Sequence, residues 1–387
     1  MENISININR LTHLLSLYGL SKDDLLSRVS DGLKKPLVEK DVFRNEISLN
    51  VLKRIDKVFG KGLSYYVDPG DLKMSKDESI FFRKDHFNGE LNFAARKIVN
   101  QFEEESLTLS VYSKLSNFKV PRLLPVYSLN DDPAIVAEEL RKRLYPKFDA
   151  DLRSFLKSII ERLAEFNVLV FEFVETWNKK EKANIDGFYI KPAVIALKRQ
   201  QQSFRREIFT LLHEFGHYLL LKEEIDQVVS EDLSNYNSLS QLERWCSNFA
   251  YYFLAGNEND SITNMEVASV RNDYQLDLIE TLSAKTHLSI DAFYTRMLLA
   301  EKISFTDYRR VIEGRHKAYL ESIQNKLLDK QMFSELEHKK FGIVPKPIIS
   351  PLFMKITQLA YIERVINDMD FCKMLHINPN QIESYLP

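Results

Sequence analysis

The sequence predicts an α+β fold that is mostly helical and has a small sheet near the middle of the chain. Over most of the length, apolar residues recur at three- and four-residue spacing, which is typical of amphipathic helices. The runs at 168–174, 187–190 and 193–197 are instead β-branched or aromatic and indicate three strands. The 387 residues include only 11 glycines and few low-complexity runs, as expected of a well-ordered helical chain.

The composition is that of a folded protein with an ordinary surface. Hydrophobic residues make up 44% of the chain and charged residues 28%, which supports sizeable cores. The formal net charge of −2 argues against a protein that coats nucleic acid with its whole surface, although it is compatible with a local basic patch. Cys246 and Cys372 lie far apart and form no CxxC pair, which suits a reducing compartment.

The start of the chain, MENISININRLTHLL, lacks a basic stretch followed by an apolar core and a cleavage site. We therefore expect no secretory signal. No run of 18 apolar residues occurs, so we expect no membrane span and no membrane partner. Together these features predict a cytoplasmic protein.

Residues 1–70 are predicted to form a domain of several short helices. Residues 9–18 repeat leucines at helical spacing, and Ser21 begins a helix with acids in its first turn. Residues 48–59 form another amphipathic helix that Ser48 caps. A helical connector at 71–130 follows, and its end is marked by the helix-breaking residues Pro121, Pro125 and Pro133.

A central domain at 131–300 is predicted to hold the strands, and a helical region at 301–387 to end the chain. The helix after Asp132 starts with Pro133, which is favoured at the first helical position. The strand at 193–197 immediately precedes an apolar helical segment at 206–221. This segment carries the motif on which the functional interpretation depends.

That motif is His-Glu-Phe-Gly-His, residues 213–217. On an α-helix, residues four apart lie on the same face, so His213 and His217 can both point a ring nitrogen at one metal ion. Glu214 lies one step round the helix, where it can act as a base beside that ion. The alternative is a buried structural helix whose histidines bond to backbone carbonyls. Buried polar triplets are costly unless something satisfies them, which favours the metal site.

A catalytic zinc site usually takes three protein ligands, so one more is required. Glu243 opens a second helical pattern at 243–254, and a helix packed antiparallel to the motif helix can deliver it. A solvated first-turn carboxylate is the alternative for Glu243. The other acids follow the motif too closely or lie before a polar, loop-like run. They are Glu223, Glu224, Asp226, Glu231 and Asp232.

The runs FTLLHEFGHYLL and LERWCSNFAYYFLAG resemble the ImmA/IrrE family of zinc metallopeptidases. The resemblance implies a zincin-like (gluzincin) peptidase domain in which His213, His217 and Glu243 bind Zn²⁺. It also implies that Glu214 is the general base. Leu212, Phe215 and Ala255-Gly256 depart from the family's usual residues, and none of these departures removes a ligand.

Many members of the family carry a Cro/repressor-type helix-turn-helix before the peptidase domain, and residues 1–70 resemble this module. Residues 1–62 hold 11 basic and 8 acidic residues, a weak electrostatic footprint for DNA. The segment 31–36 falls where a recognition helix is expected, and Pro36 would restrict it. DNA binding and retention of the domain for protein contacts both remain open.

The strand beside the motif helix is a candidate substrate site. Strands next to the metal helix of zinc peptidases commonly bind extended peptide through a free edge, so we expect Val194, Ile195 and Ala196 to do so. The alternative is that they form the sheet core. A further donor for the oxyanion is not chosen by the sequence, which offers Tyr218, Tyr251, Tyr252 and His287.

The resemblance therefore predicts a cytoplasmic zinc metalloendopeptidase. Its substrate would be a regulatory protein, of repressor or antitoxin type, in a mobile-element or stress-response system. The alternative is a DNA- or protein-binding regulator or antitoxin that uses the zinc fold as a non-hydrolytic scaffold. The oligomeric state cannot be derived from the sequence.

Overall fold

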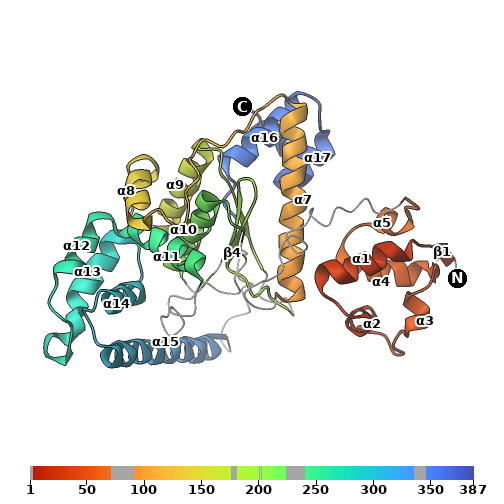
Figure 1. Cartoon of the computed structure of the whole chain (residues 1–387). Helices are drawn as coiled ribbons and strands as arrows, with labels where there is room; N and C mark the ends of the chain where they lie inside the picture. Colours follow the sequence, from red (N-terminus) through yellow and green to blue (C-terminus); the bar gives the residue numbers. More distant parts are fainter. Residues whose placement is uncertain are drawn as a thin grey trace. The chain divides into compact units, whose positions relative to one another are not determined.

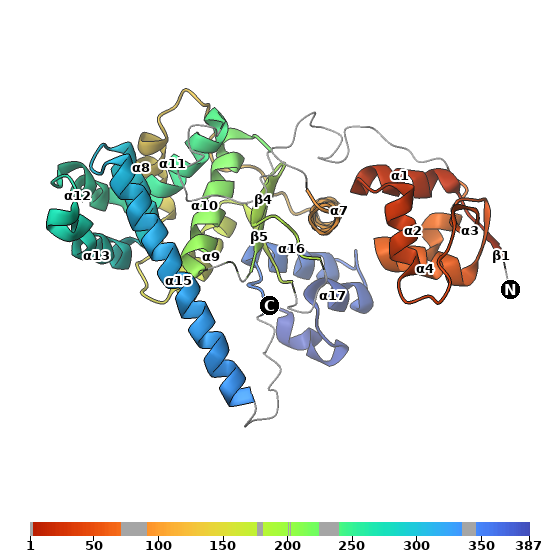
Figure 2. The same ribbon diagram turned by 90° about the horizontal axis from the view of Figure 1, so that it is seen from below.

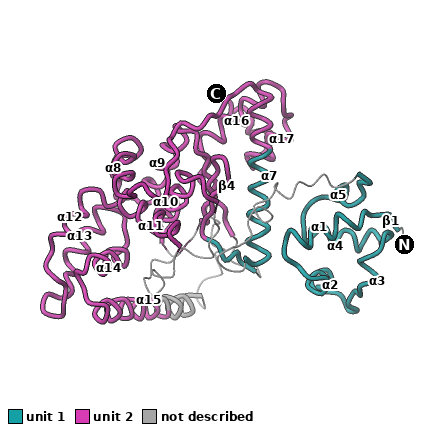
Figure 3. The backbone as a smooth tube through the Cα atoms, viewed as in Figure 1, with its two compact units in different colours: residues 1–107, 180–185 teal, residues 108–179, 186–387 magenta. Residues whose placement is uncertain are grey.

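The protein divides into two compact units in the computed structural model (Figures 1 and 3). Unit 1 comprises residues 1–107 and 180–185, and unit 2 comprises residues 108–179 and 186–387. The structure describes residues 3–70, 91–175, 181–199, 201, 203–223, 240–334 and 346–387, with backbone only for 323 and 325–334. Residues 71–90 of the predicted connector lie outside this description, and the four predicted domain ranges stay a prediction.

Unit 1 is a small helical domain closed by a two-stranded sheet. Strands β1 and β2 pair antiparallel, with Ile4 opposite Ile47. Ser21 and Asp24 form a capping box at the start of α2, and Ser48 caps α4, so both predicted helix starts are present. Buried leucines of α1 and α4 fill the interior. The elements are β1 (Asn3–Ser5), α1 (Ile8–Tyr18), α2 (Lys22–Ser30), α3 (Glu39–Val42), β2 (Glu46–Ser48), α4 (Leu49–Phe59) and α5 (Leu63–Val67).

The segment where a recognition helix is expected is mostly not helical. After α2, residues 31–38 form turns and irregular chain, and α3 is a single turn of 4 residues. Pro36 disfavours helix at the residue before it. Glu39 and Asp41 lie in the first turn of α3, and Glu39 pairs with Lys22. A single helical turn that carries two acids is poorly suited to enter the major groove of DNA. A helix-turn-helix module is therefore not confirmed.

A three-stranded mixed sheet with helices packed around it forms the centre of unit 2. The strand order is β3-β5-β4, with β5 parallel to β3 and antiparallel to β4. Helix α10 packs on β4 and β5, and α11 packs on α10 (Figure 2). None of the described helices is both long and apolar enough to cross a membrane. The central elements are α8 (Pro133–Leu144), α9 (Leu152–Glu165), β3 (Leu169–Phe173), β4 (Gly187–Ile190), β5 (Val194–Lys198), α10 (Phe204–Leu220) and α11 (Gln241–Ala255).

Helices flank this centre in both directions along the chain. Helix α7 spans the boundary between the units, because its residues up to 107 belong to unit 1 and the rest to unit 2 (Figure 3). The long helix α15 extends beyond the elements that it contacts (Figure 2). The flanking elements are α7 (Phe93–Leu115), η2 (Gly256–Glu258), α12 (Asn259–Asn264), η3 (Val270–Gln275), α13 (Leu276–Thr286), α14 (Ile290–Leu299), α15 (Phe305–Ser334), α16 (Pro351–Ile362), α17 (Asp368–Leu375) and η4 (Pro379–Tyr385).

The strand order corrects the expectation for the substrate strand. Val194, Ile195 and Ala196 lie in β5, the middle strand, where each residue has a partner in both β3 and β4. Both hydrogen-bonding edges of β5 are therefore used within the sheet, and β5 offers no free edge to a peptide. Because β4 pairs with β5 alone among the described strands, β4 is an edge strand.

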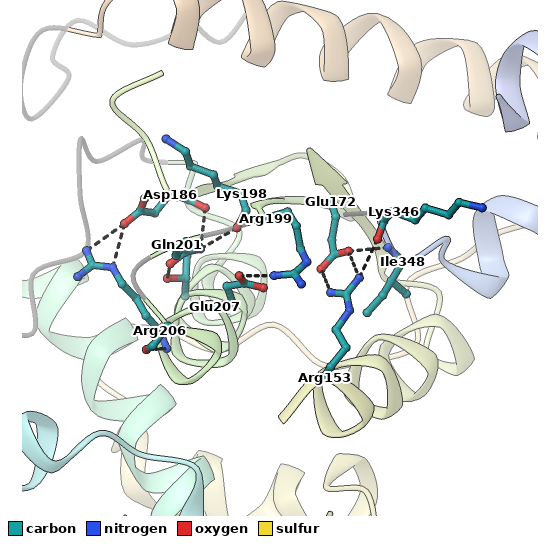
Figure 4. Close-up of polar contacts among 12 residues, drawn as sticks. Arg153, Glu172, Asp186, Lys198, Arg199, Gln201, Arg206, Glu207, Lys346 and Ile348 are labelled. Atoms are coloured by element: carbon teal, nitrogen blue, oxygen red, sulfur yellow. Dashed lines mark hydrogen bonds and ion pairs between the residues drawn. The ribbon is translucent and has the colours of Figure 1, made fainter. Parts of the chain in front are cut away.

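Residues 346–349 attach to the opposite edge of the sheet, at β3 (Figure 4). Glu172 accepts two hydrogen bonds from Arg153, at 2.6 and 2.9 Å, and one from the backbone N–H of Ile348 at 2.5 Å. Arg153 also donates to the carbonyl oxygen of Lys346 at 3.1 Å. An isolated antiparallel bridge joins Phe171 to Ile349. These bonds attach residues 346–349 to the sheet of unit 2.

Replacing Glu172 by alanine is expected to destabilise unit 2. The Glu172 side chain is 0% exposed and has Arg153 as its charged partner. Removing one member of a buried ion pair costs about 3–5 kcal/mol of unfolding free energy. Chemical denaturation measures this loss. Glu138→Ala is the matched control, because that carboxylate is 70% exposed beside Lys142 and exposed pairs contribute about 1 kcal/mol or less. Equal losses of unfolding free energy in the two variants would show that the buried Glu172–Arg153 pair does not stabilise unit 2.

Candidate metal centre

Helix α10 carries the His-Glu-Phe-Gly-His motif through the core of unit 2. The Ser203 hydroxyl accepts from the backbone N–H of Arg206 and so caps the helix start. Every residue from Glu207 to Leu220 is buried, so α10 is enclosed on all sides rather than amphipathic. The helix ends at Leu221, which takes a left-handed backbone conformation. His213, Glu214 and His217 are thus fixed by packing.

Gly216 allows α11 to approach α10 closely. A Cβ atom built on Gly216 would lie 3.1 Å from the Cα, Cβ and Sγ atoms of Cys246. The small residue at this position therefore serves a neighbouring helix. Glu243 lies one turn before Cys246 in α11, and His213 lies one turn before Gly216 in α10. The close approach is what brings the two turns together.

The three predicted ligands meet in one buried cluster. The Nε2 atom of His213 lies 3.0 Å from Oε2 of Glu243, and the Nε2 atom of His217 lies 3.2 Å from Oε1 of Glu243. The two Nε2 atoms are 3.2 Å apart. His213 and His217 are each 1% exposed, and Glu243 is 3% exposed. Within the described part of the chain, this is the group of His, Cys, Asp and Glu side chains placed to hold a metal ion.

The cluster fits Zn²⁺. Two histidines and one glutamate are a donor set of catalytic zinc sites. Tetrahedral zinc with bonds of about 2.0–2.1 Å places neighbouring donor atoms about 3.3 Å apart. The two Nε2 atoms at 3.2 Å, and Nε2 of His213 and Oε2 of Glu243 at 3.0 Å, lie close to that edge length. The other carboxylate oxygen, Oε1, lies 3.2 Å from Nε2 of His217. The residues that would hold the ion are therefore His213, His217 and Glu243.

Both imidazole rings are oriented by bonds on their outer nitrogens. The Nδ1 atom of His213 lies 3.2 Å from the hydroxyl of Ser247, and the Nδ1 atom of His217 lies 3.2 Å from the carbonyl oxygen of Lys222. Partners of this kind turn the Nε2 lone pairs of ligating histidines toward the metal. The sequence reasoning did not identify these two partners. Ser247 has a sequence signal, since it stands one helical turn after Glu243.

The Glu243 carboxyl is kept ionised by the two histidines. Burial alone would raise its pKa, but the charges and hydrogen bonds of His217 and His213 outweigh burial and lower the pKa of Glu243 well below its usual value. Ser240 caps α11, and its hydroxyl accepts from the backbone N–H of Glu243. An ionised carboxylate at this point is the form that binds a cation.

Glu214 lies against the edge strand β4. It is 3% exposed. A Cβ built on Gly187 would lie 3.1 Å from Cγ of Glu214 and 2.8 Å from Cγ2 of Thr210. The residue before β4, Asp186, is held by Arg206, whose guanidinium binds the Asp186 carboxylate (Figure 4). The base candidate and the edge strand are thus in direct contact.

The contact at Gly187 predicts a stability effect. In Gly187→Ala, the new methyl group would press on the stiff, buried Thr210 side chain, and such overpacking typically costs about 1–3 kcal/mol. Thermal or urea unfolding measures it. Gly314→Ala is the control, because a Cβ there meets nothing within 4 Å and alanine favours a helix by roughly 1 kcal/mol. A neutral or stabilising Gly187→Ala would show that the close contact is absent.

The oxyanion-donor candidates occupy different surroundings. Tyr218 stacks on Phe215, and Tyr251 is buried beneath the Arg296 guanidinium. His287 stacks on Phe155 and its Nε2 lies 2.6 Å from the carbonyl oxygen of Asp149, while burial lowers its pKa. Tyr252 is partly buried beside Tyr251.

Among the downstream acids, Glu224, Asp226, Glu231 and Asp232 lie outside the described residues.

Comparison with protein-family models gives a match over the part of the chain that holds this cluster. Residues 164–258 match the Peptidase_M78 model, the IrrE N-terminal-like domain. The IrrE-like segment contains the whole three-stranded sheet, α10 and α11, and it supports the ImmA/IrrE family and a metallopeptidase type of function. It does not extend to residues 1–70. Comparisons with curated proteins and with solved structures give no match.

Proposed function

We propose that the protein is a cytoplasmic, zinc-dependent metalloendopeptidase that cleaves a regulatory protein of repressor or antitoxin type. The observation that carries the proposal is the convergence of His213, His217 and Glu243 within 3.0–3.2 Å in the buried core of an IrrE-like segment. Two oriented imidazoles and an ionised carboxylate, with Glu214 next in sequence to a ligand, are the parts that metal-assisted peptide hydrolysis needs.

The roles of the side chains follow from their positions. Bound Zn²⁺ supplies Lewis-acid polarisation of a carbonyl and lowers the pKa of water. His213, His217 and Glu243 hold the ion, and Ser247 and the Lys222 carbonyl keep the rings turned toward it. Glu214 takes a proton from the attacking water and passes it to the leaving amine.

The substrate strand is assigned to β4 in this proposal. Asp186 and Lys198 are a bonded pair, because the Lys198 N–H donates to the Asp186 carbonyl at 2.8 Å. In an antiparallel ladder, alternate residues point their N–H and C=O groups away from the partner strand. Gly187 and Tyr189 therefore direct these groups away from β5. All four residues of β4 are buried. In this proposal, an extended substrate enters this buried place and pairs with them, beside Glu214.

Residues 1–70 are proposed to contact a protein partner rather than to read DNA. The short acidic α3 weakens the case for a recognition helix. Exposed basic residues around it, Lys34, Lys35, Lys40 and Arg44, suit an acidic protein surface as well as phosphate. A gel-shift assay with random-sequence DNA at low salt separates the two, since DNA binding there would overturn this part of the proposal.

The proposal is tested with the purified full-length chain. Elemental analysis should give one zinc per chain, and the zinc-loaded protein should generate new peptide termini in a proteome-derived peptide library read by mass spectrometry. A chelator should abolish these termini. Stoichiometric zinc without any cleavage would instead favour the non-hydrolytic scaffold, and absence of zinc would overturn the metal centre itself.

A further inference from the structure

The chain that follows α10 folds back onto His217. Leu221 has a φ of 50°, and this left-handed residue ends the helix and reverses the chain. The backbone N–H of Lys222 then donates to the carbonyl oxygen of His217 at 3.1 Å. The carbonyl oxygen of Lys222 lies 3.2 Å from Nδ1 of the same histidine. Both backbone polar groups of Lys222 thus bind one metal-ligand residue.

Glu223 ties this turn to the sheet. Its side chain is buried, at 6% exposure, and its Oε1 accepts a hydrogen bond from the backbone N–H of Lys191 at 2.8 Å. Lys191 lies in the turn between β4 and β5. The carboxylate therefore joins the end of the metal helix to the hairpin that contains the edge strand.

Glu223 adjoins the peptide unit whose oxygen contacts His217. The carbonyl of Lys222 and the amide nitrogen of Glu223 belong to the same planar peptide unit. The hydrogen bond from Lys191 to the Glu223 side chain therefore anchors the residue that directly follows the Lys222 carbonyl, and so restrains that carbonyl. A buried carboxylate is costly unless it is hydrogen-bonded, and an apolar side chain would fill the same space without that cost. The Glu223 carboxylate meets this condition, because its Oε1 accepts the N–H of Lys191.

We infer that Glu223 is a positioning residue for the metal centre. It holds the Lys222 carbonyl in place to accept the Nδ1 proton of His217, which leaves Nε2 unprotonated and directed at the ion. Glu223 is not itself a ligand, because the ligand cluster comprises His213, His217 and Glu243. The inference rests on the metal centre of the proposed function. Loss of an outer partner of a ligating histidine typically lowers metal affinity about 10–100-fold.

The test measures Zn²⁺ affinity by competition with a chelator at fixed pH, using the full-length wild type, Glu223→Ala and Glu223→Gln. Glu223→Ala should bind zinc about tenfold or more weakly. Glu223→Gln keeps an oxygen that accepts from Lys191 and should stay within about threefold of the wild type. Glu175→Ala is the matched control, since Glu175 is a buried acid, paired with Lys198 at 3.1 Å, and should leave zinc affinity unchanged.

The outcomes separate this inference from the proposed function. Wild-type affinity in Glu223→Ala, or equal weakening in the Gln variant, would overturn the positioning role and leave the metal centre standing. Failure of the wild type to bind zinc would overturn both. If Glu223→Ala does not fold, Glu223→Asp replaces it. Aspartate keeps the charge but is one methylene too short to reach Lys191. The Glu223→Asp variant should therefore bind zinc more weakly than Glu223→Gln. Equal zinc affinities of these two variants would again overturn the positioning role.

Discussion

Replacing Glu214 by glutamine is expected to abolish peptide hydrolysis while the fold and the zinc content are retained. Glutamine has the same shape and fills the same buried place beside Gly187. It cannot accept and return a proton, and general acid–base catalysis typically contributes about 10²–10⁴-fold to the rate. We therefore expect kcat to fall by at least about 100-fold, with Tm and zinc stoichiometry close to the wild-type values.

The matched control for this substitution is Glu207→Gln. Glu207 lies in the same helix and is 1% exposed, but its carboxylate pairs with Arg199 at 2.7 Å. The Glu207→Gln substitution should lower the unfolding temperature, while the folded protein keeps its peptidase activity. The two readouts are cleavage of the peptide library and unfolding temperature. Undiminished cleavage by Glu214→Gln would remove Glu214 from the mechanism and require another base.

Replacing Glu243 by alanine is expected to remove the response of the protein to zinc. A ligand that binds only the folded state at 100 times its Kd adds about 2.7 kcal/mol to the unfolding free energy. For a unit of this size each kcal/mol raises Tm by about 2–4 °C, so the wild type should gain roughly 5–10 °C on zinc addition. Without the carboxylate, the two imidazoles at 3.2 Å lose the third donor and the shift should vanish.

Gln241→Ala controls for effects on the first turn of α11. Gln241 is exposed in the same turn and should leave the zinc-induced shift intact. Differential scanning fluorimetry with and without added zinc gives both numbers. A full shift in Glu243→Ala would mean that some other side chain completes the site, and the ligand assignment would then be wrong.

The sequence alone determined the features that depend on neighbours in the chain. The four-residue spacing of His213 and His217 places both rings on one helical face, whatever the rest of the fold does. The three strands were predictable because β-branched and aromatic runs are short-range signals, and they occur as β3, β4 and β5. Helix starts at Ser21, Ser48 and Asp132 were readable for the same reason.

Tertiary structure decided what lies between distant residues. Strand order is not encoded in the pattern of any one strand. The predicted strand at 193–197 was expected at an edge, but it forms β5 between two partners, and the edge strand is β4. The reach of Glu243 depends on the missing side chain at Gly216, which sets the distance between two helices. The acceptors for the outer histidine nitrogens are a hydroxyl on α11 and a backbone carbonyl. A carbonyl belongs to every residue, so only the turn at Leu221 could select the one at Lys222.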